Sequence, residues 1–198
     1  QSKNHFNQGS RQKNFFSKEK IKINNQKVNI MRRFCSYGPV DCEEHYCLDR
    51  TEIVEHCFLQ LIGNPKKGGH FFTIWAPRQC GKTWLTYQMK KEVERQYKDK
   101  FTVGLMSMQG VIMNDNDPSE SFLSRVPMLF SRALKVDVDA PATWEEFGKL
   151  FSTSMNLFKK PLILFMDEFD KLPPLVIDRL VSIFRDIYLD RENFNLHS

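Results

Sequence analysis

The chain has 198 residues, a length that suits one domain of ordinary size. With 41% hydrophobic and 27% charged residues, its composition is that of a globular protein rather than a disordered or membrane protein. No apolar run approaches the roughly 20 residues that cross a bilayer, and the polar, basic start is not typical of a secretory signal. We therefore expect a cytoplasmic protein with no membrane partner.

The net charge of +5 is distributed unevenly along the chain. The first 33 residues hold nine Lys and Arg against one acid, a net of +8, so the remaining residues carry −3. Nucleic acid is therefore not an expected partner of the folded part. Residues 1–30 are rich in Asn, Gln, Lys and Ser and are predicted to be a disordered basic leader, with Met31 as the natural start. A nucleic-acid-binding arm is the alternative for this leader.

The cysteines do not follow a metal-binding pattern. Four of the five lie between positions 35 and 57, with gaps of six, four and nine residues. Structural zinc sites usually use pairs separated by two to four residues, and only one of these three gaps falls in that range, so no zinc is expected. An odd number of cysteines without a secretory signal favours reduced thiols.

Apolar periodicity predicts helices and strands from position 49 onward. A first helix is predicted to begin with a capping box of Asp49 and Glu52 and to end at Gly63. The next elements are a buried strand over 70–75, a helix over 82–97 and a second strand over 101–108.

The second half of the chain continues this alternation. Asp117-Pro118 and Thr143 each mark a helix start, and Pro127 is expected to kink the first of these helices. The run 162–166 is apolar on both faces, which is typical of a central strand in a parallel sheet. A last helix is predicted over 174–189. Strands separated by helices indicate an α/β domain with three layers, α/β/α, around a mostly parallel sheet.

A phosphate-binding loop is predicted between the strand at 70–75 and the helix that follows it. Gly81 lets the backbone approach phosphates, Lys82 can reach the outer phosphates, and the Thr83 hydroxyl can ligate Mg²⁺. The pattern departs from the usual G-x₄-G-K-[ST] at Ala76, where Gly is standard. The expected nucleotide contacts of this segment are Ala76, Pro77, Arg78, Gln79, Cys80, Gly81, Lys82, Thr83 and Trp84.

Two carboxylates at the end of the strand 162–166 form the second motif. Asp167 is placed to hold Mg²⁺, and Glu168 is placed to orient and deprotonate an attacking water. The guanine-selecting pattern Asn-Lys-x-Asp is absent from the chain, and Glu directly after the magnesium Asp is typical of ATPases. We therefore expect ATP with Mg²⁺, with Lys82 and Glu168 as the catalytic residues.

With these motifs the chain resembles the AAA-like ATPases of the AAA+/STAND branch over residues 33–198. Its leader is similar to that of uncharacterised prokaryotic AAA-like proteins. The residues that carry this resemblance are Arg33-Phe34, Gly38-Pro39, Glu43-Glu44-His45-Tyr46, Arg50 and the Ala-Pro-Arg-Gln-x-Gly-Lys-Thr loop.

The resemblance implies the α/β/α fold of P-loop NTPases. It implies a leader and helix over 31–69 that flank the nucleotide site, and an ATPase core over 70–198. In the family a sensor strand lies between the strands of the two motifs, and a helical lid follows, so the chain is expected to be truncated before both. By resemblance Tyr46 and Arg50 lie near the base or ribose; Tyr46 in the core and Arg50 as a surface charge is the alternative.

The expected function is ATP binding and Mg²⁺-dependent hydrolysis that drives a conformational or assembly switch. Whether this chain turns ATP over by itself, or binds it only, is left open by the sequence. Self-association through the ATPase domain is a further interaction to consider. The alternatives are a nucleotide-gated signalling or defence scaffold with slow or no turnover, a DNA-processing motor, and a small-molecule kinase, for which no acceptor pocket or lid is evident.

Overall fold

The computed structural model describes residues 22–23, 26–27, 32–35, 43–64, 67–77 and 79–198. The chain divides into two compact units, residues 1–48 and 49–198. Within the described residues, no helix combines the length and the apolar character needed to cross a membrane.

The first unit contains little regular structure among its described residues. β1 (Lys22–Ile23) pairs antiparallel with β2 (Gln26–Lys27). Further along, Arg33 forms an ion pair of 3.3 Å with Glu44. Most of the predicted leader at 1–30 lies outside the described residues, so its disorder stays a prediction.

The cysteines are not all reduced. Cys57 and Cys80 are free thiols, whereas Cys47 is disulfide-bonded. The expectation of reduced thiols throughout is therefore wrong for Cys47. It failed because neither the odd number of cysteines nor their wide spacing excludes one bonded pair.

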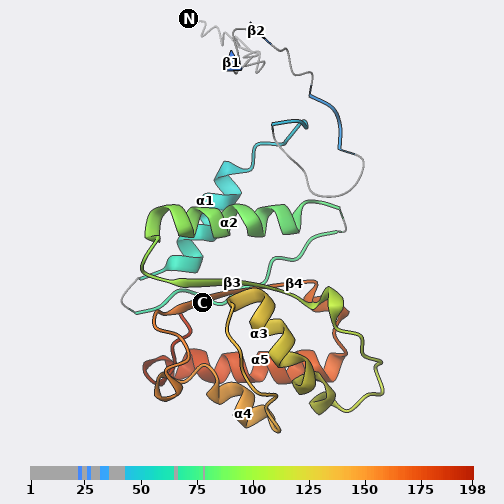
Figure 1. Cartoon of the computed structure of the whole chain (residues 1–198), viewed down its shortest axis with the longest axis vertical. Coiled ribbons are helices and arrows are strands. Elements are labelled where there is room, and N and C mark those ends of the chain that lie inside the picture. The colour runs from blue at the N-terminus through green and yellow to red at the C-terminus, as the bar shows by residue number, and fades with distance from the viewer. Residues whose placement is uncertain (1–21, 24–25, 28–31, 36–42, 65–66, 78) are drawn as a thin grey trace, which may run out of the picture. The chain divides into compact units, whose positions relative to one another are not determined.

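The second unit is an α/β domain built on a parallel pair of strands (Figure 1). β3 (Thr102–Ser107) pairs with β4 (Leu162–Asp167) in a register that runs from Thr102 opposite Leu162 to Ser107 opposite Asp167. Both strands were predicted. Because successive side chains of a strand point to opposite faces, the apolar run of β4 supplies core residues on both faces of the sheet.

Two helices cover one face of the strand pair (Figure 1). They are α1 (Thr51–Ile62) and α2 (Lys82–Tyr97), which pack against each other and bury Ile163 and Phe165 of β4. α2 has the bounds that its periodicity predicts. α1 ends at Gly63, as predicted, where the backbone adopts a positive φ of 49°.

The other face is covered by the helices of the second half (Figure 1). A 3₁₀ segment, Ser119–Arg125, passes into α3 at Val126, next to the predicted kink at Pro127. The α-helices on this face are α3 (Val126–Leu134), α4 (Trp144–Lys149) and α5 (Pro174–Leu189). The abundant Phe residues meet here: the ring of Phe151, which is fully buried, contacts those of Phe130, Phe147, Phe158 and Phe184.

The start of α1 differs from the predicted capping box. Asp49 Oδ1 accepts a hydrogen bond of 2.9 Å from the backbone N–H of Thr51, and Arg50 occupies the N-cap position. Asp49 therefore does not cap through the third helical residue, so the capping box with Glu52 is wrong. The predicted cap at Thr143 is confirmed, because its hydroxyl accepts from the backbone N–H of Glu146 at 3.2 Å.

Residues 70–75 do not form the predicted strand. Residues 196–198 lie beside β4 instead: Leu162 and Leu196 form a parallel bridge, and Leu164 N donates to Ser198 O at 2.8 Å. At the start of the predicted strand, Gly69 N donates to His197 O at 3.0 Å and His70 N donates to Gln60 O at 3.0 Å. An apolar run needs a paired neighbour to become a strand, and 70–75 has none among the described residues.

Candidate functional site

The loop before α2 is shaped to present backbone N–H groups. Gly81 is the N-cap residue of α2 and has a left-handed backbone, with φ 84° and ψ 28°. Gln79 also has a positive φ, of 60°, which is uncommon for a residue with a side chain. The first turn of α2 contains no acidic residue. A helix N-terminus with free N–H groups and no carboxylate of its own favours an anionic ligand.

Lys82 is held against its own loop. Its Nζ donates hydrogen bonds to Ala76 O at 2.7 Å and to Pro77 O at 3.1 Å. These two bonds to neutral carbonyls keep the ammonium beside the helix start and leave one of its three donors for another acceptor. The Lys82 side chain is half-buried, and its charge lies beside the loop that precedes α2.

Thr83 and Asp167 bring the two predicted motifs into direct contact. The Thr83 hydroxyl donates a hydrogen bond of 2.8 Å to Oδ2 of Asp167, at the end of β4. The other oxygen, Oδ1, accepts from the backbone N–H of Glu168 at 3.0 Å. Hydroxyl and carboxylate oxygens are hard donors, the kind of ligand that Mg²⁺ binds.

The oxygen donors of Thr83 and Asp167 fit Mg²⁺ better than they fit a metal whose ligands all come from the protein. Among the described residues, no three His, Cys, Asp or Glu side chains gather as a metal cluster. Mg²⁺ does not require one, because it usually keeps several waters and is held by one or two carboxylates together with phosphate oxygens.

Glu168 lies at the turn out of β4 and has a left-handed backbone, with φ 58° and ψ 33°. Its Oε2 is 3.1 Å from Nζ of Lys171, and both side chains are partly exposed. Lys171 was not singled out in the sequence. A Lys three residues after a predicted catalytic Glu is a signal that could have identified it, because such a spacing allows an ion pair within one turn.

The remaining predicted site residues lie as follows. Cys80 and Trp84 are half-buried, and Arg78 is outside the described residues. Arg50 belongs to the second unit, and its guanidinium lies against Gly81. Tyr46 belongs to the first unit, where its ring contacts that of Phe34 with centroids 4.9 Å apart.

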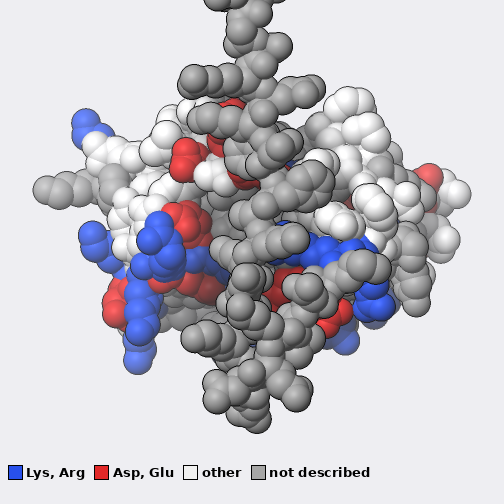
Figure 2. All heavy atoms as spheres, turned by 90° about the horizontal axis from the view of Figure 1, so that it is seen from above, with Lys and Arg blue, Asp and Glu red and all other residues white. Residues whose placement is uncertain are grey.

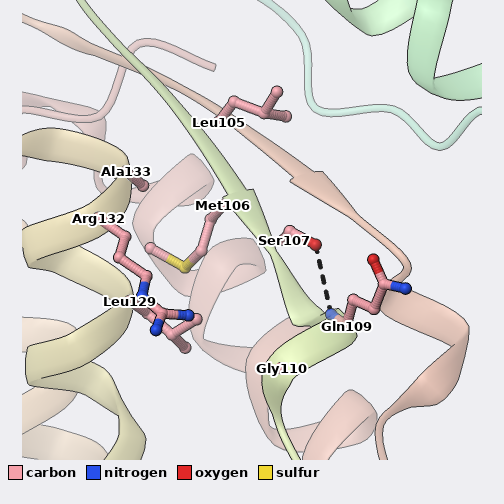
Figure 3. A pocket seen from close by; sticks show the side chains of 8 residues that line it. All are labelled: Leu105, Met106, Ser107, Gln109, Gly110, Leu129, Arg132 and Ala133. Atoms are coloured by element: carbon pink, nitrogen blue, oxygen red, sulfur yellow. Dashed lines mark hydrogen bonds between the residues drawn. The ribbon is translucent and has the colours of Figure 1, made fainter. Parts of the chain in front are cut away.

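A cavity of about 400 Å³ lies at the end of β3 (Figure 3). Ser107 is the register partner of Asp167, and its Oγ accepts a hydrogen bond of 3.3 Å from the backbone N–H of Gln109. Arg132 extends from α3 along the other wall, toward Gly110 (Figure 3). Ser107 was missed by the sequence reasoning, although polar residues at the carboxyl end of a parallel strand are a known signal for sites.

The charges of the visible surface are mixed. Among the described residues on the face seen in Figure 2, basic and acidic side chains lie side by side.

Comparison with known proteins supports one assignment. No curated protein and no solved structure matches the chain. Among models of protein families, the AAA-like domain matches residues 35–196, which is most of the sequence. The match includes both strands, the loop before α2 and the Thr83–Asp167 contact. The chain therefore belongs to the AAA-like domain family.

Proposed function

We propose that this AAA-like domain binds ATP together with Mg²⁺ and hydrolyses it. The observation that carries the proposal is the hydrogen bond of 2.8 Å between Thr83 and Asp167. It joins the helix start after the loop to the end of β4, so one small volume contains a hydroxyl, a carboxylate and the N-terminus of α2. The family assignment supports the same role at a coarse level.

Each residue of the site has a distinct task in this proposal. Lys82 exchanges its two loop carbonyls for phosphate oxygens, which are stronger partners because they are charged. Thr83 and Asp167 hold Mg²⁺, which when bound neutralises charge on the phosphates. The N–H groups at the start of α2 bind the remaining phosphate oxygens.

Glu168 is the residue we assign to the attacking water. Its carboxylate is one residue past the magnesium Asp167, so it can accept a proton from a water placed beside the outer phosphate. For this it must release Lys171, with which it is paired at 3.1 Å. An ion pair between partly exposed groups is weak, so this release costs at most about 1 kcal/mol.

ATP is proposed over GTP because the chain has no Asn-Lys-x-Asp pattern. The experiment is a measurement of phosphate release from Mg²⁺-ATP and Mg²⁺-GTP by the wild-type chain and by Glu168→Gln, with binding measured on the same samples. We expect release from ATP in the wild type, and binding without release in the variant. Release by Glu168→Gln at the wild-type rate would remove the role of Glu168.

A second candidate function is a nucleotide-gated scaffold with slow turnover. The pairing of Glu168 with Lys171 favours it, because a Glu that is engaged by a lysine is less available to a water. The same two measurements separate the candidates. Tight ATP binding without detectable release in the wild type identifies the scaffold, whereas release that depends on Glu168 identifies the hydrolase.

A further inference from the structure

The side chain of Arg50 reaches the phosphate-binding loop from a different helix. Its backbone is fixed at the N-cap of α1, where its carbonyl accepts from Val54 N at 2.9 Å. A Cβ placed on Gly81 would lie 3.1 Å from Nη1 and 3.4 Å from both Cζ and Nη2 of Arg50. The guanidinium is therefore seated directly on the glycine that opens α2.

Positive charge gathers beside Arg50 at the start of α2. Lys82 is the next residue after Gly81, and the N-terminus of α2 adds the positive end of its dipole. The first turn of α2 contains no acid, and within the described part of the chain the Arg50 guanidinium forms no ion pair with a carboxylate. Two cations beside a helix N-terminus favour an anion between them, and the Asp167 carboxylate at this helix start is hydrogen-bonded to Thr83 rather than to Arg50.

We propose that Arg50 contacts the phosphate chain of the bound nucleotide, rather than its base or ribose. This inference rests on the proposed function, since it names a further binding residue of the same site. A guanidinium is suited to the task because its planar fork donates two parallel hydrogen bonds to phosphate oxygens. Recognition by Arg50 is then independent of the base, so it contributes equally to every nucleoside triphosphate.

The test compares ligands that share phosphates and differ in the base. Affinities of the wild type and Arg50→Ala are measured for Mg²⁺-ATP, Mg²⁺-GTP and inorganic tripolyphosphate with Mg²⁺. We expect Arg50→Ala to weaken all three by a common factor of about ten to a hundred, the usual range for a lost charge-assisted hydrogen bond. The ratio of ATP to GTP affinity stays at its wild-type value.

A base or ribose contact gives the opposite pattern. In that case Arg50→Ala leaves tripolyphosphate binding unchanged, weakens ATP binding and changes the ratio of ATP to GTP affinity, and the proposal is overturned. Arg50→Lys separates charge from geometry, because it keeps a point charge and loses the fork. We expect its affinities to fall between those of the wild type and Arg50→Ala.

The control variant is Arg179→Ala, which removes an equal charge from an exposed position on α5, on the other side of the sheet. It should leave all affinities unchanged. If Arg50→Ala does not fold, Arg50→Gln, which keeps a shorter polar side chain and loses the charge, is measured in its place. A wild type that binds none of the three ligands overturns the proposed function itself. If the wild type and both Arg50 variants bind the three ligands equally well, only the assignment of Arg50 is overturned.

Discussion

Thr83 and Asp167 are 84 positions apart in the chain, yet the hydroxyl of one donates to a carboxylate oxygen of the other at 2.8 Å. The contact is made across the carboxyl end of the parallel strands, where α2 begins and β4 ends. Open α/β sheets bind ligands at this edge, and the hydrogen bond marks the point at which the two motifs of the sequence meet.

Removal of either partner should change how ATP affinity responds to magnesium. In Asp167→Asn the amide can still accept from Thr83, but the charge that attracts Mg²⁺ is lost. We expect ATP affinity in this variant to be nearly the same with Mg²⁺ and with a chelator, whereas in the wild type Mg²⁺ strengthens it. Thr86→Ala is the control, because that hydroxyl donates to Lys82 O, one turn back along α2. Equal magnesium dependence in Asp167→Asn and wild type would exclude Asp167 as a ligand.

Gly81→Ala should cost stability as well as binding. The φ of 84° is unfavourable for a residue with a Cβ by about 1–2 kcal/mol, and the new methyl group would press on the Arg50 guanidinium. We expect a decrease of that size in the free energy of unfolding, together with weaker ATP binding. Urea titration measures the first and calorimetry the second.

Gly110→Ala is the matched control for that variant. A Cβ at Gly110 would meet only Nη1 of Arg132, at an ordinary distance of 3.7 Å, and its backbone has no positive φ. Its stability should stay within about 0.5 kcal/mol of the wild type. Equal losses in both variants would show that the loop conformation at Gly81 has no special role.

Lys171→Ala should release Glu168 at little cost in stability. The two side chains are about 40% exposed, and exposed ion pairs contribute at most about 1 kcal/mol. We expect turnover of ATP to rise in this variant if the pair restrains Glu168, with ATP affinity unchanged. Lys149→Ala, which breaks a pair with Glu145 on α4, is the control. A loss of turnover would instead assign Lys171 a direct part in the reaction.

His197 should make the stability of the domain depend on pH. Its ring is buried beside Phe101, and Nε2 lies 3.0 Å from Ile62 O. Burial lowers the pKa of His197 below its ordinary value of about 6.5. The unfolded chain therefore takes up a proton before the folded one does, and stability is lost as the pH falls below about 6.5.

Urea unfolding at pH 7.5 and pH 5.5 measures this effect. We expect the wild type to lose more stability over that interval than His197→Gln, which has no proton to take up at this position. His56→Gln is the control, because that side chain is exposed on α1 and should keep the wild-type response. An identical response in His197→Gln and wild type would locate the pH dependence elsewhere.

Much of the second unit follows from local sequence signals. The bounds of α2 and α5 match their apolar periodicity, and the apolar run of β4 matches its burial on both faces. The loop before α2 and the pair Asp167 and Glu168 were predicted as sites for the same reason, since each motif is contiguous in the chain.

What could not be predicted depends on contacts between distant segments. Residues 70–75 have the composition of a strand, but residues 196–198 lie along β4. Arg50 reaches Gly81 only because α1 packs against α2, a relationship that no local pattern encodes. The capping box was predicted from the spacing of Asp49 and Glu52. That spacing does not show which residue occupies the N-cap, and the backbone places Arg50 there.

The measurement that tests the account most directly is the thermal unfolding of the wild type and Lys82→Ala, each with and without Mg²⁺-ATP. A ligand present at about 100 times its Kd stabilises the folded state by ~2.7 kcal/mol. We expect a clear rise in Tm for the wild type and none for Lys82→Ala. Lys91→Ala, an exposed lysine on the same helix, should keep the wild-type shift. A wild type that unfolds cooperatively with no shift, or a shift that persists in Lys82→Ala, would contradict a nucleotide site at this loop.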